Sequence, residues 1–263
     1  GTMRQNMAFD FSGRVILVTG GTKGIGRGIA QAFLKAGARV IICGRSAPEM
    51  PVVCGTATAD FFPLDVRDVD AVKALFDGIA TDYGRLDVLI NNAGGSPNAD
   101  AATASPRFHE SIIRLNLIAP FHMAQMANAI MQNQPEGGVI EFIGSVSALR
   151  PSPGTAAYGA AKAGILNLVS SLAVEWAPKV RVVTISPGLI RTEKSDMHYG
   201  DEAGLASVAA TIPLGRMGES EDIANGCMFM ASPYAAYVSG TNLLIHGGGE
   251  KPAFLEAASA NRD

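Results

Sequence analysis

Residues 14–30 read RVILVTGGTKGIGRGIA, an apolar run followed by a glycine-rich turn and a stretch of helical composition. A turn of this kind between a strand and a helix lets the backbone approach a pyrophosphate, which sits at the helix N-terminus. Taken alone, such a turn is also compatible with an ordinary tight turn. Its place in a strand–helix unit favours phosphate binding, and the missing Gly-Lys-Ser/Thr ending argues against a nucleoside-triphosphate P-loop.

The rest of the chain alternates short apolar runs with helical stretches. Helical composition or spacing is found at residues 24–36, 68–83 and 157–176, whereas residues 46–60 are so interrupted by Pro and Gly that we expect a loop or a degenerate helix. The strand candidates are nearly continuous Val/Ile/Leu runs, which is typical of parallel strands buried on both faces. The pattern predicts a single-domain α/β Rossmann fold, a doubly wound seven-stranded parallel sheet with helices on both faces. The predicted strands are residues 14–20, 39–44, 61–66, 86–94, 138–145, 180–188 and 242–248.

The chain has no internal repeat and no Ser/Pro-rich linker, so one domain at residues 10–249 is the economical interpretation. Residues 1–9 are set apart as a disordered N-terminus or cloning remnant, and residues 250–263 as a C-terminal tail. Residues 189–214 follow the sixth strand and mix polar with bulky side chains, and we expect them to form a mobile substrate lid in which His198 is a candidate contact.

Composition excludes several classes of protein. The 263 residues are 48% hydrophobic with a net charge of −3, which argues against a disordered chain and gives no basic excess for nucleic acid. Three scattered cysteines without a CxxC define neither a disulfide framework nor a zinc site, and His109 and His122 have no neighbouring ligand set, so no metal is expected. The uncharged stretches 115–135 and 223–249 are broken by polar residues and prolines, which predicts no membrane span. With no secretory signal visible, a cytoplasmic location is expected.

Five motifs occur in a fixed order along the chain. TGxxxGxG spans residues 19–26, NNAG spans residues 91–94, YxxxK spans residues 158–162, Ser145 lies 13 residues before Tyr158, and Pro-Gly ends the sixth strand at residues 187–188. In these motifs and their order, residues 10–249 resemble the short-chain dehydrogenase/reductase family. The resemblance implies a Rossmann-fold oxidoreductase that transfers a hydride between NAD(P) and a small-molecule carbonyl or alcohol substrate.

The resemblance also implies which residues bind the cofactor. NAD-preferring members usually carry an acidic residue at the end of the second strand, where this chain has Gly44 followed by Arg45. Two cations, Lys23 and Arg45, suit a 2′-phosphate, so NADP(H) is favoured over NAD(H), although both can also be solvated surface cations. Asp65 resembles the residue that contacts adenine, and it can instead be a cap or turn aspartate. The full predicted set is Gly20, Thr22, Lys23, Gly24, Ile25, Gly26, Arg45, Asp65, Val66, Asn92, Ala93, Gly94, Tyr158, Lys162, Pro187, Gly188, Ile190 and Thr192.

The predicted catalytic residues are Asn116, Ser145, Tyr158 and Lys162. Tyr158 and Lys162 are four residues apart on one helix face, so the ammonium and the positive nicotinamide are expected to lower the pKa of the phenol, which then exchanges a proton with the substrate oxygen. Ser145 would hydrogen-bond the same oxygen, with Ser147 as the candidate capping residue. Family analogy gives Lys162 the nicotinamide ribose and Asn116 a proton relay, although Asn116 can instead cap or kink a helix.

The helix predicted at residues 157–176 is apolar nearly all round, so both of its sides need cover. We expect it and the helices near 107–133 to pair with symmetry mates in a dimer or, as in the family, a homotetramer; the alternative is an Ala-rich helix with small exposed patches. His246 stands where the family often has aspartate, and no chemistry is assigned to it.

These inferences predict an NADP(H)-dependent oxidoreductase that interconverts a ketone and a secondary alcohol with tyrosine as general acid and base. The alternatives are an NAD(H)-dependent dehydrogenase of a steroid- or sugar-like secondary alcohol and, in another class, a catalytically silent dinucleotide-binding sensor.

Overall fold

The computed structural model describes residues 8–193, 195 and 199–258. Its β-strands are β1 (Val15–Thr19), β2 (Arg39–Gly44), β3 (Val53–Cys54), β4 (Ala57–Thr58), β5 (Asp60–Pro63), β6 (Val88–Asn91), β7 (Gly138–Ile143), β8 (Val180–Pro187), β9 (Ile190–Arg191), β10 (Gly218–Glu219) and β11 (Asn242–Ile245). Its helices are α1 (Gly24–Lys35), α2 (Val69–Asp82), α3 (Pro106–Ile113), α4 (Ala119–Met131), α5 (Ala156–Trp176), α7 (Glu202–Ala210), α8 (Ser220–Ala231) and α9 (Ala253–Ala257), with the π turn η2 (Arg114–Ile118) and the 3₁₀ turns η3 (Val146–Ala148) and η4 (Pro233–Ala235).

The central sheet has seven parallel strands in the order β11-β8-β7-β6-β1-β2-β5. The prediction of a seven-stranded, doubly wound parallel sheet is confirmed: β6 is the central strand, and the direction of winding reverses between β6 and its neighbour β1. The strands are shorter than predicted at most ends; the third, for example, is Asp60–Pro63 rather than 61–66. A crevice outside the carboxyl ends of the strands follows from this topology, beside the point where the strand order reverses.

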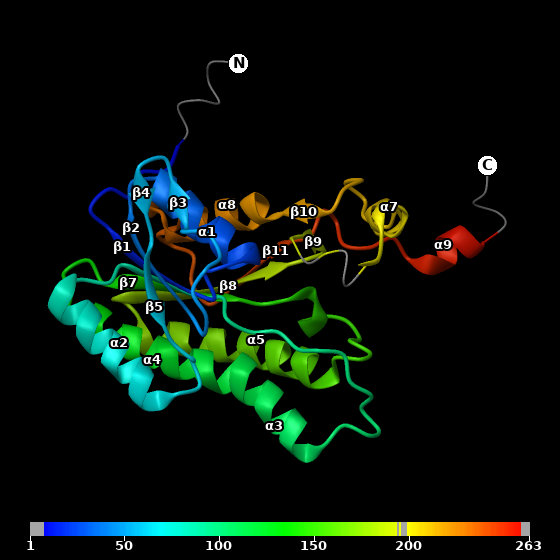
Figure 1. Ribbon diagram of the computed structural model, residues 1–263, viewed down its shortest axis with the longest axis horizontal. Helices are drawn as coiled ribbons and strands as arrows, with labels where there is room; N and C mark the ends of the chain where they lie inside the picture. The colour runs from blue at the N-terminus through cyan, green and yellow to red at the C-terminus, as the bar shows by residue number, and fades with distance from the viewer. Residues whose placement is uncertain (1–7, 194, 196–198, 259–263) are drawn as a thin grey trace.

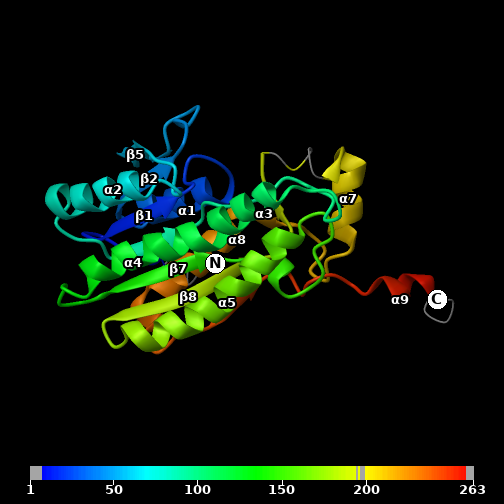
Figure 2. The same cartoon turned by 90° about the horizontal axis from the view of Figure 1, so that it is seen from below.

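Helices cover both faces of the sheet (Figure 1), because successive side chains of each strand point to opposite faces. Leu17 of β1 and Ile41 of β2 face α2, α4 and α5, where they join Phe76, Met123 and Ile165 in one buried cluster. The neighbouring strand residues face α1 and α8 in a second cluster, which includes Ile16, Val18, Ile29, Phe33 and Cys227. Figure 2 shows α4 and α5 lying side by side along the first of these faces.

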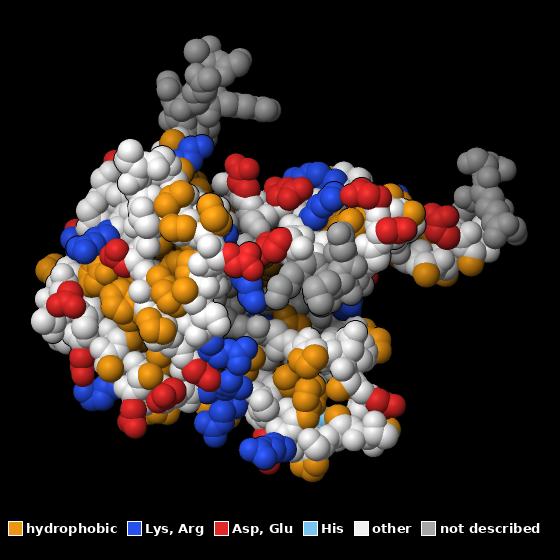
Figure 3. Space-filling model, viewed as in Figure 1, with side chains coloured by type: hydrophobic (Ala, Val, Ile, Leu, Met, Phe, Trp, Pro, Cys, Tyr) orange, Lys and Arg blue, Asp and Glu red, His pale blue; other side chains and the backbone are white. Residues whose placement is uncertain are grey.

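The connection between β2 and β5 differs from the expectation for residues 46–60. It forms a two-stranded antiparallel hairpin, β3 and β4, that packs against α1. Pro48, Pro51 and Gly55 interrupt the segment, and prolines remove the backbone donors that a helix needs. Apolar side chains gather on the surface over this hairpin and the edge strand β5 (Figure 3), where Met50, Val53 and Phe62 are exposed.

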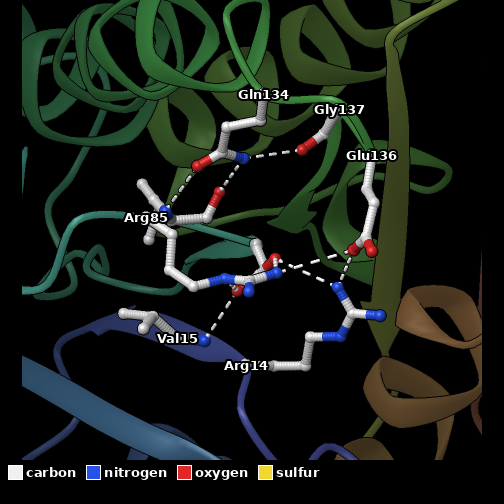
Figure 4. A network of polar contacts seen from close by, with 8 residues as sticks. Arg14, Val15, Arg85, Gln134, Glu136 and Gly137 are labelled. Atoms are coloured by element: carbon white, nitrogen blue, oxygen red, sulfur yellow. Dashed lines mark hydrogen bonds and ion pairs between the residues drawn. The ribbon is translucent and has the colours of Figure 1, made fainter.

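A polar network joins the amino ends of three strands, on the side opposite to the carboxyl-end crevice. Asp87, which precedes β6, accepts hydrogen bonds from the backbone N–H of Val15 at 2.8 Å and from the Arg85 guanidinium at 2.7 and 2.8 Å. Arg14 pairs with Glu136, and the Gln134 amide bonds both backbone groups of Leu86 (Figure 4). The network fixes β1, β6 and the turn before β7 relative to one another.

The segment predicted as a substrate lid, residues 189–214, contains two elements that sequence inspection did not identify. The short strand β9 pairs in parallel with β10, and α7 follows with Asp201 capping its first turn. His198 lies outside the described residues. Beyond β11 the tail carries the short helix α9, which extends away from the body (Figure 1) and exposes Phe254 and Leu255.

Within the described part of the chain, α5 is the one helix long and apolar enough, by length and composition alone, to cross a membrane. The core helix of a globular protein passes the same test, and α5 packs against β8 and η3 through Ile165, Val169 and Leu172.

Candidate active site

The glycine turn between β1 and α1 packs closely against the loop that follows β6. Gly20 and Gly24 adopt positive φ angles of 62° and 58°, a region that glycine enters without steric cost. Gly26 acts through packing, since a Cβ there would lie 2.2 Å from the Gly20 carbonyl oxygen and 2.4 Å from Asn92 Nδ2. The Asn92 amide also donates to the Gly20 oxygen at 3.2 Å. These contacts hold the glycine turn after β1 against the NNAG loop after β6, at the carboxyl ends of the strands.

A cavity of about 450 Å³ runs along this edge. It is lined by eleven of the residues predicted to bind the cofactor, namely Gly20, Thr22, Lys23, Ile25, Arg45, Asp65, Val66, Asn92, Ala93, Gly94 and Thr192. The other seven predicted residues are not among its lining residues, and their contact with the cofactor stays a prediction: Gly24, Gly26, Tyr158, Lys162, Pro187, Gly188 and Ile190. The lining also contains residues that were not predicted to bind the cofactor, namely Cys43, Gly44, Ser46, Leu64, Arg67 and Leu115. Apart from Leu115, they lie within four residues of the carboxyl ends of β2 and β5, which was the available signal.

Thr19, at the end of β1, holds the NNAG loop in place. Its buried hydroxyl oxygen accepts hydrogen bonds from the backbone N–H groups of Asn92 and Ala93, both at 2.9 Å. The loop continues to Gly94, where an added Cβ would lie 2.7 Å from Asn116 Oδ1 and 3.5 Å from Lys162 Nζ. The predicted cofactor loop and two of the predicted catalytic residues therefore meet at Gly94.

Asn116 is fully buried in the π turn η2, which joins α3 to α4 in one continuous helical run. Its Oδ1 accepts from the Gly95 N–H at 2.9 Å, and its Nδ2 donates to the Gly95 oxygen at 2.9 Å and to the Ile112 oxygen at 3.0 Å. The side chain thus fixes the loop after β6, and a role in proton relay stays a prediction.

Asp65 and Arg67 form a tight pair at the cavity wall. The Arg67 guanidinium donates to both carboxylate oxygens at 2.9 Å, and its backbone N–H donates to Oδ1 at 3.0 Å. Arg67 therefore holds the pKa of the Asp65 carboxyl below its usual value, and Arg45 adds a weaker effect in the same direction. The alternative that Asp65 caps α2 is excluded, because Asp68 performs that role.

Ser145, Tyr158 and Lys162 lie together beyond Gly94, at the ends of β7 and α5. The Lys162 ammonium is buried, donates to the Ile143 carbonyl at 2.9 Å and lies 5.6 Å from the centre of the Tyr158 ring. Ser145, not Ser147, is the cap of η3: its Oγ accepts from the Ser147 N–H at 3.0 Å. Accepting that bond leaves the hydroxyl hydrogen of Ser145 available to a partner.

The pKa of Tyr158 is raised, whereas the sequence led us to expect a lowered value. Burial raises it, and a hydrogen bond between the Ser145 and Tyr158 side chains lowers it in part. Burial also lowers the pKa of the Lys162 ammonium to about 8. Among the chain's own groups, desolvation of the phenol thus outweighs the hydrogen bond from Ser145, and the phenol stays protonated at neutral pH.

The groups around the cavity fit a dinucleotide. The start of α1 offers backbone N–H donors, has no acidic residue in its first turn and already receives an anion, because Glu193 Oε1 accepts from the Gly24 N–H at 2.7 Å. Cations line the end of the cavity near β2, and the NNAG loop leads toward Tyr158 and Lys162. Within the described ranges, no group of three or more His, Cys, Asp or Glu is placed to hold a metal ion.

Residues 20–250 match the family model described as enoyl-(acyl carrier protein) reductase. The chain is 35% identical over 243 residues to a 3α-hydroxysteroid dehydrogenase of Mediterraneibacter gnavus, with 89% of this chain and 96% of the relative covered. It is 33% identical over 242 residues to the 3-oxoacyl-(acyl-carrier-protein) reductase FabG of Escherichia coli, with 91% and 98% covered. The structure of the aldohexose dehydrogenase of Thermoplasma acidophilum superposes with a TM-score of 0.83 at 29% identity, covering 92% of this chain and 94% of that one.

Motifs, fold and relatives agree. The chain belongs to the short-chain dehydrogenase/reductase family and is an NAD(P)-dependent oxidoreductase that acts on carbonyl and alcohol groups.

Proposed function

We propose that the enzyme uses NADP(H) and reduces a ketone or other small-molecule carbonyl compound to a secondary alcohol. One observation carries the choice of cofactor: β2 ends in Gly44, and the residues that follow it into the cavity wall are Arg45 and Ser46, with no carboxylate there. An acidic residue at this position would pair with a ribose 2′-hydroxyl and repel a 2′-phosphate, whereas a guanidinium binds phosphate with two parallel hydrogen bonds.

The proposed catalytic roles follow from the geometry at the end of β7. When bound, the nicotinamide supplies or accepts the hydride. Tyr158 donates a proton to the carbonyl oxygen, and the Ser145 hydroxyl hydrogen-bonds the same oxygen. Lys162 carries its charge next to the phenol, and its contact with the cofactor ribose is part of the proposal. Asn116 holds the loop at Gly94 and Gly95, against which the ring would lie.

The protonation of Tyr158 supports reduction as the favoured direction near neutral pH. A general acid must carry its proton when the hydride arrives, and burial raises the pKa of this phenol. Oxidation of an alcohol needs the phenolate, so we expect its rate to rise at alkaline pH, where the phenol loses its proton.

The cofactor proposal is tested by steady-state kinetics with NADPH and NADH on a panel of ketones. We expect a higher kcat/KM with NADPH, and Arg45→Ala should raise KM for NADPH about tenfold or more while leaving KM for NADH nearly unchanged. A higher kcat/KM with NADH in the unmodified enzyme would replace this proposal with the NAD(H)-dependent alcohol dehydrogenase.

The role of Tyr158 is tested separately. Tyr158→Phe should lower kcat by about 10²-fold or more, the typical contribution of general acid catalysis, while calorimetric cofactor affinity stays unchanged. Turnover that survives this substitution would remove Tyr158 as the acid. A chain that binds cofactor but turns over no member of the panel, even unmodified, would favour the silent sensor.

A homotetramer is proposed as the working assembly, through α5 and the α3–η2–α4 run. The exposed residues of α5 include Ala160, Ala163, Asn167, Ser170, Ser171 and Val174, and Glu175 near its end is the one exposed charged residue of this helix. The adjacent run exposes Ile118 and Phe121. Exposed faces with few charges are typical of surfaces that a second subunit covers, although α3 and η2 also expose Arg107, Glu110 and Arg114.

A further inference from the structure

The start of α1 receives its hydrogen-bond acceptor from far away in the sequence. Glu193 Oε1 accepts from the backbone N–H of Gly24 at 2.7 Å, across 169 residues of chain. Gly24 is the first residue of α1, and the N–H groups of a first helical turn have no partner within the helix. They also carry the positive end of the helix dipole, so a carboxylate is held there by charge as well as by the hydrogen bond.

The helix provides no acceptor of its own at this end. The N-cap residue Lys23 makes no side-chain capping bond, and the first turn contains no acidic residue. By contrast, α2 is capped by Asp68, α3 by Ser105 and α7 by Asp201, each through a side-chain oxygen three residues ahead of the donor. The carboxylate of Glu193 therefore occupies a backbone donor at the start of α1, the kind of helix N-terminus at which a glycine-rich turn holds a pyrophosphate.

Hydrogen bonds between the neighbours of Glu193 in the sequence fix the backbone on both sides of it. The preceding residue, Thr192, lines the cofactor cavity, and its N–H donates to the buried Ser195 Oγ at 2.7 Å, while the Ser195 N–H donates back to the Thr192 oxygen at 3.1 Å. This closed turn directly follows β9, which pairs with β10, and the next residue after β10 is Ser220. A Cβ on Gly28 would lie 2.4 Å from the Ser220 Cβ, so the first residue of α8, directly after β10, packs against α1.

We propose that Glu193 is an internal competitor of the cofactor, whose carboxylate occupies the pyrophosphate position at the start of α1 until the dinucleotide displaces it. Two anions at one helix N-terminus repel each other, and both need the same donors. The dinucleotide must therefore break the Glu193–Gly24 bond before its phosphates can bind. The measured Kd then equals the intrinsic Kd divided by the fraction of chains in which the carboxylate has left the helix. The proposal rests on dinucleotide binding by the family and is independent of whether NADP(H) or NAD(H) is preferred.

The test is a calorimetric titration of the full-length protein and its Glu193→Ala and Glu193→Gln variants with whichever dinucleotide the unmodified enzyme binds more tightly. We expect Glu193→Ala to bind about two- to fivefold more tightly, which matches the usual strength of a charge at a helix terminus. Glu193→Gln should lie in between, since its amide oxygen can still accept the hydrogen bond but carries no charge. The ligand-free Glu193→Ala protein should also melt at a lower temperature, because the end of α1 has lost its acceptor.

Two controls separate displacement from a general change in charge. Adenosine 2′-monophosphate is an anion that lacks the pyrophosphate, so its affinity should be the same for all variants. Glu202→Gln removes a charge from the same segment, at a side chain that is 86% exposed and paired with Arg191, and should leave the dinucleotide affinity unchanged. Unchanged or weaker dinucleotide binding by both Glu193 variants overturns the proposal, as does equal tightening for the 2′-monophosphate or in Glu202→Gln.

Discussion

At the scale of single residues, Lys162 combines a buried position with a charge that the proposed chemistry needs. Burial lowers its pKa to about 8 from an ordinary 10.5. Below about pH 8 the ammonium is charged in both the folded and the unfolded chain, and its desolvation cost is borne in full. Between about pH 8 and 10.5 the folded chain releases the proton first, so the unfolded chain binds more protons and stability rises with pH through this window.

We therefore predict that Lys162→Met removes this rise. The contribution is on the order of 3 kcal/mol at 1.36 kcal/mol per pKa unit. Urea unfolding at pH 7.5 and pH 10 measures it, as the change in unfolding free energy with pH in the unmodified protein minus that in the variant; the subtraction cancels tyrosines and cysteines that titrate in the same range. Parallel pH profiles for the two proteins would show that the ammonium is better solvated than the structure indicates.

A second residue-scale prediction concerns Arg67. Asp65 Oδ1 accepts hydrogen bonds from the guanidinium and from the backbone N–H of Arg67, whereas Oδ2 accepts only one, from the guanidinium. A lone pair of Oδ2 is therefore left for a donor in the cavity. If that donor is the adenine amine, Arg67→Gln should reduce the preference for the natural cofactor over its hypoxanthine analogue, in which an oxygen replaces the amine, by about three- to tenfold. Arg67→Lys should restore part of it. An equal loss of affinity for both cofactors would instead mean that Arg67 only supports the cavity wall.

Spacing within the sequence was sufficient to bring some site residues together and not others. Tyr158 and Lys162 share one helix, and Ser145 and the NNAG loop end strands whose carboxyl ends must meet at one edge of the sheet. The contact of Glu193 with Gly24 joins an irregular segment after β9 to the start of α1, and no periodicity in the sequence indicates it. The raised pKa of Tyr158 escaped prediction for a similar reason, since it depends on how much solvent the folded chain excludes.

At the scale of elements, the long apolar strands and periodic helices were predictable because their patterns reflect burial on two faces. The β3–β4 hairpin was not predictable, because each of its strands has only two residues, too few to show an alternating pattern. The prolines and glycines of this segment argued against a helix, but they did not indicate that a hairpin forms instead. The strand β9 and the helix α7 were missed in the same way, within a segment interpreted only as a loop.

The network at the amino ends of the strands gives the element-scale prediction. Asp87 has a buried carboxylate that joins β1 to β6 through the Val15 N–H and pairs with Arg85. Asp87→Ala leaves a backbone donor and a guanidinium without their acceptor, so urea unfolding should show a loss of about 2–4 kcal/mol. Calorimetric cofactor affinity should be unchanged, because the network lies at the opposite end of the strands from the cavity. A loss of affinity at full stability would contradict this division between a stabilising end and a binding end.

At the scale of the whole molecule, the proposed tetramer makes a prediction that the isolated chain does not. Val174 is 80% exposed on α5 and Val69 is 55% exposed on α2, which lies outside the proposed interface. An arginine at either exposed helical position costs the single chain little, but at an interface it places a charge against an apolar partner surface. Light scattering coupled to size-exclusion chromatography should therefore give a tetramer for the unmodified protein and for Val69→Arg, and a smaller species for Val174→Arg with unaltered circular dichroism. A monomeric unmodified protein, or an identical mass for all three proteins, would mean that Val174 and its neighbours on α5 are exposed to solvent and would contradict the proposed tetramer interface.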